Sequence, residues 1–174
     1  MSRIFAFLAA ILLLASCSRT IYVVRHAERM KAPANASGMV SNDMPLSEAG
    51  KVRSFVLRDE LMNKRIRHIY STNTVRTIST ADPLSQVLNV PIQIYNTKDS
   101  LDQFIEMVRN MKGNMLVVGH SNTVDDIVNK LCRETKVPGD LADSVYDNFY
   151  IITQKGKKME FRARKYGYPS APEK

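Results

Sequence analysis

The chain has 174 residues, with 25 Lys and Arg against 17 Asp and Glu, and a formal net charge of +8 at pH 7. Its length is that of one domain with a sizeable core, and its 44% apolar and 24% charged residues are ordinary for a globular protein. The seven glycines and seven prolines form no repeat or low-complexity tract, which excludes repeat and low-complexity architectures.

The first 16 residues differ in character from the rest of the chain. Arg3 precedes an almost unbroken apolar run over residues 4–14, which is short for a membrane span and typical of a secretory signal. The sequence Leu14-Ala15-Ser16-Cys17 resembles the cleavage box of bacterial lipoproteins. This resemblance implies cleavage before Cys17, lipidation of its thiol and attachment to a bacterial membrane, facing the periplasm or the exterior. A plain signal peptide and an uncleaved anchor are the alternatives.

Residues 17–174 are expected to form one domain. A β-branched run predicts its first strand over residues 20–25, and a polar stretch over residues 30–45 predicts a loop. Ser47 is expected to cap the helix that follows. The apolar residues at helical spacing, which predict the inward face of this helix, are Val52, Phe55, Val56 and Leu61.

The same periodicities continue along the chain. Strands are predicted over residues 66–70, 91–95 and 114–118, and helices over residues 74–88, 100–112 and 123–132. Pro83 is expected to kink or restart the second of the four predicted helices. Residues 149–153 and 159–164 flank Gln154-Lys155-Gly156-Lys157, which predicts a hairpin.

This alternation predicts an α/β fold. Strands that alternate with helices form a mostly parallel sheet covered on both faces, which is a three-layer α/β/α sandwich. The terminal hairpin should add antiparallel strands at one edge of that sheet. The length leaves no room for a second domain.

Two of the three histidines follow directly on buried strands. The first strand ends on Arg25-His26 and the fourth on Gly119-His120, while Arg76 follows the second strand, near the start of a helix. In open α/β sheets, ligands bind at the carboxyl ends of the strands. His26 could act there as a base, a nucleophile or a metal ligand, or it could be a core histidine. Arg25 beside it disfavours a bound cation, so no metal site is expected.

The arginines point to an anion. A guanidinium fork matches phosphate oxygens and keeps its charge at every relevant pH. The amides at the start of the helix that holds Arg76 add partial positive charge. We therefore predict that the side chains of Arg25, His26, Arg76 and His120 form a site for a phosphoryl group.

Four motifs in order carry a family resemblance. They are Arg25-His26-Ala27-Glu28, Leu46-Ser47-Glu48-Ala49-Gly50, Tyr70-Ser71-Thr72 with Arg76-Thr77 and Thr80-Ala81, and Gly119-His120-Ser121-Asn122. They resemble the motifs of the histidine phosphatase superfamily, in its phosphoglycerate mutase-like branch. The resemblance runs from Ile21 to about Thr153, which is most of the chain after the signal.

The resemblance implies a mechanism without a cofactor. His26 would be the catalytic nucleophile that accepts the phosphoryl group as phosphohistidine, and water would hydrolyse this intermediate. The residues that would bind the phosphoryl oxygens and stabilise the transition state are Arg25, Arg76 and His120. Of these, His120 would also count as a catalytic residue. The expected activity is that of a phosphatase acting on a phosphomonoester or a phosphohistidine. A mutase-like phosphotransferase and a phosphate-binding module without turnover are the alternatives.

The sequence departs from the family pattern in three places. Ala27 replaces the usual glycine and is expected to narrow the floor of the pocket. The motif that usually carries the general acid is missing, so Asp99 is the candidate acid, with Asp125 and Glu28 as fallbacks. The segment that caps the substrate in larger members is nearly absent. The pocket should therefore be open, and the expected partner is a phosphoprotein or a phosphorylated small molecule.

The remaining basic residues give no sign of a nucleic-acid site. Lys155, Lys157, Lys158, Arg162, Arg164 and Lys165 lie close together in the sequence, but no aromatic-rich recognition module accompanies them. They are expected to form a solvated face, or one that favours an anionic membrane or substrate.

Overall fold

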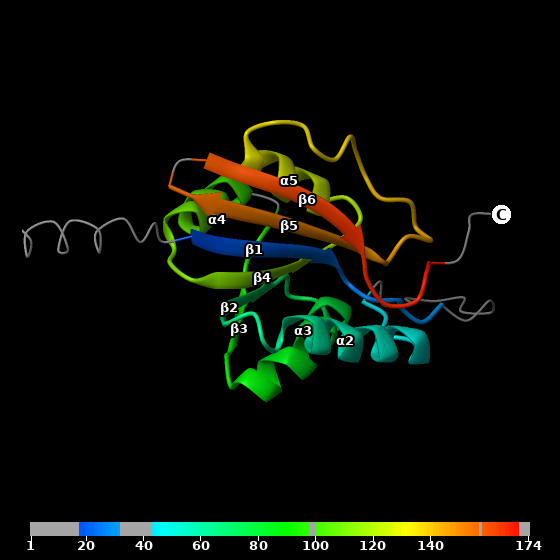
Figure 1. The fold of residues 1–174 in the computed structure, drawn as a ribbon. Coiled ribbons are helices and arrows are strands. Elements are labelled where there is room, and N and C mark those ends of the chain that lie inside the picture. The colour runs from blue at the N-terminus through cyan, green and yellow to red at the C-terminus, as the bar shows by residue number, and fades with distance from the viewer. Residues whose placement is uncertain (1–17, 32–42, 98–99, 157, 171–174) are drawn as a thin grey trace, which may run out of the picture.

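The computed structural model describes residues 18–31, 43–97, 100–156 and 158–170 (Figure 1). The predicted signal over residues 1–16, the lipidation candidate Cys17 and the candidate acid Asp99 therefore lie outside the described residues, as does Lys157. The described elements are β1 (Ser18–Arg25), α2 (Glu48–Leu61), β2 (Ile66–Ser71), α3 (Val75–Leu88), β3 (Ile92–Ile94), α4 (Leu101–Asn110), β4 (Asn114–Gly119), α5 (Val124–Cys132), β5 (Asn148–Lys155) and β6 (Lys158–Lys165).

The strands form one six-stranded sheet in the order β3-β2-β4-β1-β5-β6. Strands β1, β2, β3 and β4 pair in parallel, as expected when a helix connects successive strands. The terminal hairpin adds to the free side of β1, where β5 runs antiparallel to β1 and β6 forms the edge. The predicted mostly parallel sheet with an antiparallel hairpin is confirmed.

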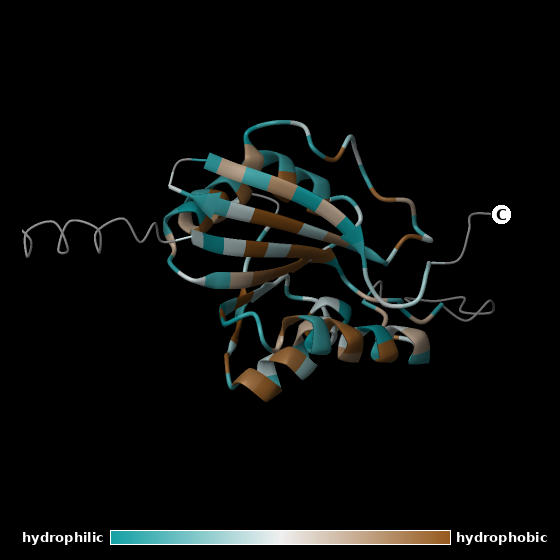
Figure 2. Ribbon diagram, in the orientation of Figure 1, coloured by the Kyte–Doolittle hydropathy of each residue, from teal (hydrophilic) through white to brown (hydrophobic). Residues whose placement is uncertain are grey.

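Helices cover both faces of the sheet. Figure 1 shows α2 and α3 together on one face and α4 and α5 on the other. Alternate residues of β1 supply the two cores: Ile21 and Val23 pack toward α4 and α5, and Tyr22 and Val24 toward α2 and α3. The apolar residues are accordingly concentrated in the central strands (Figure 2). The fold is the predicted three-layer α/β/α sandwich.

The inward face of α2 differs from the prediction. Val52 and Phe55 are about half exposed, at 47% and 49%, whereas Arg53 and Leu57 are buried. The first turns of α2 cover the polar segment that follows β1 rather than the apolar core, so a buried ion pair replaces apolar contacts there. The prediction is wrong for Val52 and Phe55, whereas Leu61 is buried in the core and Val56 packs against it, as predicted.

The helix ends follow the predicted signals in part. Ser47 caps α2 by accepting a hydrogen bond from the amide of Gly50, as predicted. α3 runs from Val75 to Leu88 as one helix that includes Pro83, so the proline does not restart it. Ser100 precedes α4 but makes no capping hydrogen bond through its side chain.

Candidate active site

The parallel strands bring the predicted residues to one edge of the sheet. His26 follows β1, Arg76 follows β2 in the first turn of α3, and His120 follows β4. Together they border a pocket of about 220 Å³. The residues that line it are Arg25, His26, Arg29, Arg76, His120, Ser121, Asn122 and Asp143.

His26 is held in one tautomer. Its backbone amide donates to the carbonyl of Gly119 at 2.9 Å, which joins the ends of β1 and β4. Its Nδ1 lies 2.8 Å from the carbonyl oxygen of Ala27. A carbonyl only accepts, so Nδ1 carries the proton and Nε2 keeps its lone pair. The geometry therefore leaves Nε2 as the nucleophilic nitrogen of the ring.

The surroundings of His26 keep it neutral. Its side chain is buried, with 3% exposed. This burial, with the charges of Arg25 and Arg76, lowers the pKa of His26 to about 3. An imidazole with this pKa is unprotonated at every pH at which the protein would work, which is the state that a nucleophile needs.

His120 approaches His26 edge-on, with ring centroids 5.4 Å apart. Its Nδ1 accepts from the Arg76 guanidinium at 3.2 Å, so its Nε2 donates to the hydroxyl of Thr72 at 2.8 Å. Burial and the charges of Arg76 and Arg25 lower the pKa of His120 to about 4. A phosphate dianion in the pocket would oppose these cations and favour a protonated His120.

Arg25 is a buried cation held by backbone oxygens. Its side chain is 2% exposed, and its guanidinium donates to the carbonyls of Ala142, Asp143 and Val145. It also stacks over the ring of Tyr146, 4.2 Å from the centroid. These contacts fix the guanidinium at the side of the pocket, and its buried Nε makes no hydrogen bond within the described part of the chain.

Two further charged residues beside the pocket were not predicted. Asp43 accepts from the amide of Val75 at 2.9 Å and pairs with Arg76 at 3.3 Å, so it both caps α3 and holds the guanidinium. Arg29 lines the pocket and adds repulsion to both Arg25 and Arg76. Asp43 lies within the 30–45 stretch and Arg29 directly before it, where no periodicity identifies a functional side chain.

The second and third motifs support the segment that carries His26. The hydroxyl of Thr80 accepts from the amide of Ala27 at 2.9 Å, and the hydroxyl of Ser47 donates to the carbonyl of Glu28 at 3.2 Å. A Cβ on Gly50 would lie 2.1 Å from this same carbonyl, so only glycine lets α2 approach so closely. Ala27 is fully buried and does not line the pocket, so the expected narrowing of the floor is wrong.

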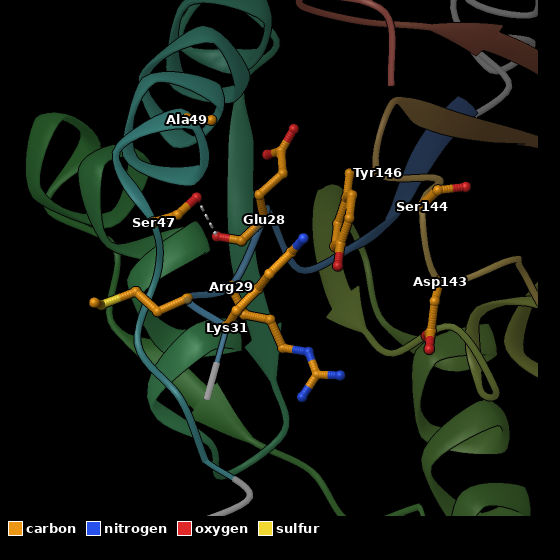
Figure 3. Close-up of a pocket in the computed structure, with 9 residues that line it drawn as sticks. Glu28, Arg29, Lys31, Ser47, Ala49, Asp143, Ser144 and Tyr146 are labelled. Carbon is orange, nitrogen blue, oxygen red and sulfur yellow. Dashed lines mark hydrogen bonds between the residues drawn. The ribbon is translucent and has the colours of Figure 1, made fainter. Parts of the chain in front are cut away.

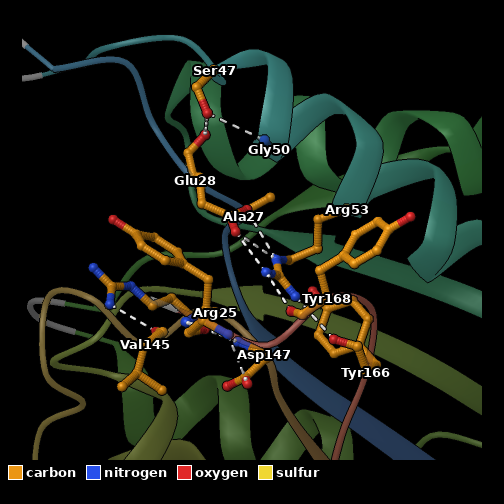
Figure 4. A network of polar contacts seen from close by, with 12 residues as sticks. Arg25, Ala27, Glu28, Ser47, Gly50, Arg53, Val145, Asp147, Tyr166 and Tyr168 are labelled. Carbon is orange, nitrogen blue, oxygen red and sulfur yellow. Dashed lines mark hydrogen bonds and ion pairs between the residues drawn. The ribbon is translucent and has the colours of Figure 1, made fainter. Parts of the chain in front are cut away.

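Glu28 belongs to a separate polar network. Its carboxylate pairs with the guanidinium of Arg53, which is 4% exposed, at 2.6 Å. Arg53 also donates to the carbonyls of Tyr166 and Tyr168, each at 2.9 Å, which ties the segment after β6 to the segment after β1 (Figure 4). Glu28 does not line the pocket of His26, so this fallback for the general acid is better understood as a structural partner of Arg53.

The other carboxylates considered for the general acid are Asp125, Asp99 and Asp143. Asp125 lies in the first turn of α5, does not line the pocket, and burial raises the pKa of its carboxyl. Asp99 is outside the described residues. Within the described ranges, Asp143 is the one carboxylate that lines the pocket, and its side chain is 85% exposed.

A larger hollow adjoins this pocket and shares Arg29 and Asp143 with it. Its volume is about 800 Å³. Figure 3 shows its two walls: residues 28–31 and the start of α2 form one, and the segment with Asp143, Ser144 and Tyr146 forms the other.

The described part of the chain contains neither a metal-binding cluster nor a membrane-spanning helix. No group of three or more His, Cys, Asp and Glu side chains there could hold a metal ion. None of the described helices is long and apolar enough to span a bilayer.

A family model matches the amino-terminal part of the described chain. The model of the histidine phosphatase superfamily (branch 1) matches residues 21–102, which include Arg25, His26 and Arg76. The match to this superfamily covers 82 of the 174 residues, just under half of the chain. His120 lies beyond this match, and the structure brings it to the other three. No curated protein matches the sequence.

Solved structures share the fold at low sequence identity. The protein histidine phosphatase SixA, in a structure complexed with tungstate, is 15% identical with a TM-score of 0.64, over 84% of this chain and 96% of that one. A mycobacterial glucosyl-3-phosphoglycerate phosphatase is 11% identical with a TM-score of 0.59, over 86% and 98%. Phosphoglycerate mutase from Plasmodium falciparum is 14% identical with a TM-score of 0.54, over 90% and 94%.

Proposed function

We propose that this protein is a phosphatase that hydrolyses a phosphomonoester or a phosphohistidine through a covalent phosphohistidine on Nε2 of His26. The observation that carries the proposal is the fixed, neutral ring of His26. Its Nδ1–H is bound by the carbonyl of Ala27, and its Nε2 lone pair is available beside Arg25 and Arg76.

In the first step, the Nε2 lone pair attacks phosphorus and the bond from phosphorus to the leaving group breaks. The leaving group takes that electron pair and a proton. Arg25, Arg76 and His120 hold the three phosphoryl oxygens, because a loose phosphoryl-transfer transition state needs positioning and charge stabilisation above all. In the second step, water gives a proton back to the group that protonated the leaving group and its oxygen attacks phosphorus, while the P–N bond breaks and its electron pair returns to Nε2.

The proton for the leaving group requires a donor. Asp99 is our candidate from the sequence, and Asp143 is a second one because it lines both the pocket and the adjoining hollow. Asp99→Asn and Asp143→Asn separate the two. The variant that loses the donor should lower turnover strongly while phosphate affinity changes little. An unchanged turnover in either variant removes that residue from the role.

The proposed substrate is a phosphate carried by a protein or by a small molecule large enough to extend into the adjoining hollow. The hollow of about 800 Å³ beside the pocket supports this choice, as do the exposed Arg29 and Lys31 on its wall. A phosphoprotein and a phosphorylated small molecule both fit this description. A screen of sugar phosphates, nucleotides and phosphohistidine peptides would distinguish them by kcat/KM.

The alternatives make different predictions in one experiment. The full chain is assayed with an aryl phosphate, with His26→Ala as the test variant and His68→Ala, which alters the histidine outside the pocket, as the matched control. We expect hydrolysis by the wild type and by His68→Ala only. Activity of His26→Ala equal to wild type would refute the enzyme proposal, and transfer of the phosphoryl group to a second alcohol in preference to water would indicate a mutase.

For location, we propose that the protein is anchored in the cell envelope through a lipid on Cys17. The support is the sequence alone: an apolar run over residues 4–14 followed by Leu14-Ala15-Ser16-Cys17. Cys17→Ala should release the protein from membranes. Retention of this variant in the membrane fraction would contradict the lipid anchor.

A further inference from the structure

Five separate segments lie together at the end of the sheet opposite the active site, where the parallel strands begin. β1 begins there at Ser18, which pairs with Lys155 at the end of β5. The connection from α2 to β2 joins the start of β4 through a hydrogen bond from the Asn114 side chain to the carbonyl of Lys64, at 2.6 Å. The same Asn114 side chain accepts from the amide of Thr20 at 2.8 Å. We call this the amino edge, because the parallel strands begin at it.

The ends of α4 and α5 complete the amino edge. Arg19, the second residue of β1, donates to the carbonyl of Arg109 in the last turn of α4, at 2.6 Å. The side chain of Arg109 in turn reaches the carbonyl of Lys130 in α5. A hollow of about 530 Å³ lies between these helix ends and the β5–β6 turn, lined by Arg109, Arg133 and Gly156 among others. The segments are therefore one continuous surface.

This surface is basic and largely unneutralised. Five of its exposed basic residues have no carboxylate partner within the part of the chain that the structure describes: Lys64, Arg65, Arg67, Lys112 and Arg133. Among the other basic residues, Arg109, Lys155 and Lys158 pair with Glu106 or Glu160, and Lys130 pairs with Asp102. Cations near the carboxyl ends of helices are common, and helix dipoles account for part of this charge, but not for Arg67, which lies within β2.

The sequence brings an apolar segment to the same place. The apolar run over residues 4–14 ends four positions before Ser18, where β1 begins, and Cys17 directly precedes Ser18. Four positions span at most about 14 Å, which is less than twice the Debye length of about 8 Å at physiological ionic strength. A bilayer that holds this run, or a lipid on Cys17, would therefore lie within electrostatic range of the amino edge.

We propose that the amino edge is a docking surface for anionic phospholipid headgroups, which orients the anchored protein with its active site away from the membrane. The proposal rests on the membrane attachment proposed above and is independent of the phosphatase reaction. A basic side chain near an anionic bilayer favours contact by about fivefold. Several such residues close to a short tether are sufficient to make the docked orientation dominant.

The orientation has a consequence for the substrate. β1 has eight residues and therefore spans about 26 Å from the amino edge to His26. Figure 1 shows the start of β1 and its carboxyl end at opposite ends of the sheet. In the docked orientation the pocket opens to the aqueous side, so the phosphate group arrives on a soluble partner rather than on a lipid of the same membrane.

Lysine footprinting tests the orientation directly. The full chain is placed in vesicles of phosphatidylcholine alone or of phosphatidylcholine with phosphatidylglycerol, and exposed lysines are acylated with a membrane-impermeant reagent. On the anionic vesicles we expect acylation of Lys64 and Lys112 to slow by about tenfold, while Lys165 at the catalytic end of β6 keeps its rate. Moderate salt should abolish the difference without releasing the protein, because screening weakens headgroup attraction only.

Matched variants assign the effect to the surface. Arg65→Glu with Arg67→Glu should remove the protection of Lys64 and Lys112. Lys51→Glu with Arg162→Glu makes the same change in net charge away from the amino edge and should leave the protection intact. Equal acylation on both vesicles, or protection lost equally in both double variants, would overturn the proposal. Equal protection by a single-stranded oligonucleotide on neutral vesicles would also overturn it and would indicate a nucleic-acid surface.

Failure of the anchor gives a different result. A chain that does not stay on phosphatidylcholine vesicles at all refutes the attachment on which the proposal rests. A chain that stays on both kinds of vesicle without differential protection refutes the docking surface itself.

Discussion

Cationic side chains lie at both edges of the sheet where strands begin or end, but they are held differently at the two. At the catalytic edge, Arg25 is buried and held by three backbone carbonyls, and Arg76 is fixed by Asp43 and His120. At the amino edge, Lys64, Arg65 and Lys112 are exposed and have no carboxylate partner among the described residues. Fixed cations can match the three oxygens of one phosphoryl group, whereas exposed, adaptable cations suit a diffuse anionic surface. Fixation, and not charge alone, therefore distinguishes the two arginines that we propose to bind the phosphoryl group.

The largest effect should come from removing a fixed cation. Arg25→Ala should lower kcat/KM by about 10² to 10³-fold, the range seen when one donor to a transition-state oxyanion is removed. Arg25→Lys should recover little of this loss, because an ammonium reproduces neither the planar fork nor the stacking on Tyr146. Steady-state kinetics with an aryl phosphate measure both variants. A lysine variant as active as wild type would show that charge at this position is sufficient.

The next effect concerns the ion pair between Glu28 and Arg53, which positions the segment after His26. Arg53→Met should reduce the free energy of unfolding by about 3 kcal/mol, because it leaves a carboxylate without its buried partner. It should also lower kcat more than it raises KM, since the His26 ring loses its fixed placement. Denaturant unfolding and kinetics measure the two effects.

A matched pair on the surface provides the control for that prediction. Arg164 and Glu60 pair at 2.7 Å but are 36% and 34% exposed. Arg164→Met should change the free energy of unfolding by less than about 1 kcal/mol and leave kcat unchanged. Equal losses in the two variants would contradict a positioning role for Arg53.

The third effect is a pH dependence of stability. Burial lowers the pKa of His26 to about 3 and that of His120 to about 4, against 6.5 in the unfolded chain. Between these values the unfolded state binds more protons, so the free energy of unfolding should fall as pH falls from about 6.5 toward 4. His120→Asn should flatten this dependence, as measured by urea unfolding across the pH range. Histidine resonances that titrate near pH 6.5 in both side chains would contradict it.

The pKa of His120 should also respond to ligand. Inorganic phosphate in the pocket brings negative charge beside a ring that faces Arg76, so the pKa of His120 should rise when phosphate binds. NMR titration with and without phosphate measures the change. No change would place the phosphate away from His120.

The smallest effect is expected at the amino edge. Arg65→Glu with Arg67→Glu should leave kcat/KM in detergent within about twofold, because the strand register places Arg67 about six residues, or about 20 Å, before His26. The same assay used for Arg25 measures it. A large loss of kcat/KM in this double variant would show that charges at the amino edge affect the active site. The two edges would then not be independent.

The sequence predicts the fold and the residues proposed to bind the phosphoryl group. It predicts only some of the contacts that hold those residues in place. β-branched runs identify the strands that end on Arg25 and His120, and parallel topology brings their ends together. Arg53 could not be predicted as a buried residue, because its partner Glu28 is 25 residues away in sequence and periodicity placed Val52 and Phe55 inside. Asp143 and Tyr146 lie in an irregular segment that only tertiary structure brings to Arg25.

One measurement tests the central account most directly. The full chain is mixed with excess phosphorylated substrate, quenched in base within milliseconds and digested, and the peptides are analysed by mass spectrometry. The account predicts an acid-labile, base-stable phosphoryl group on His26 that is absent from His26→Ala and present in Arg65→Glu with Arg67→Glu. Turnover with the phosphoryl group on another residue, or with no phosphorylated peptide at any quench time, would contradict it.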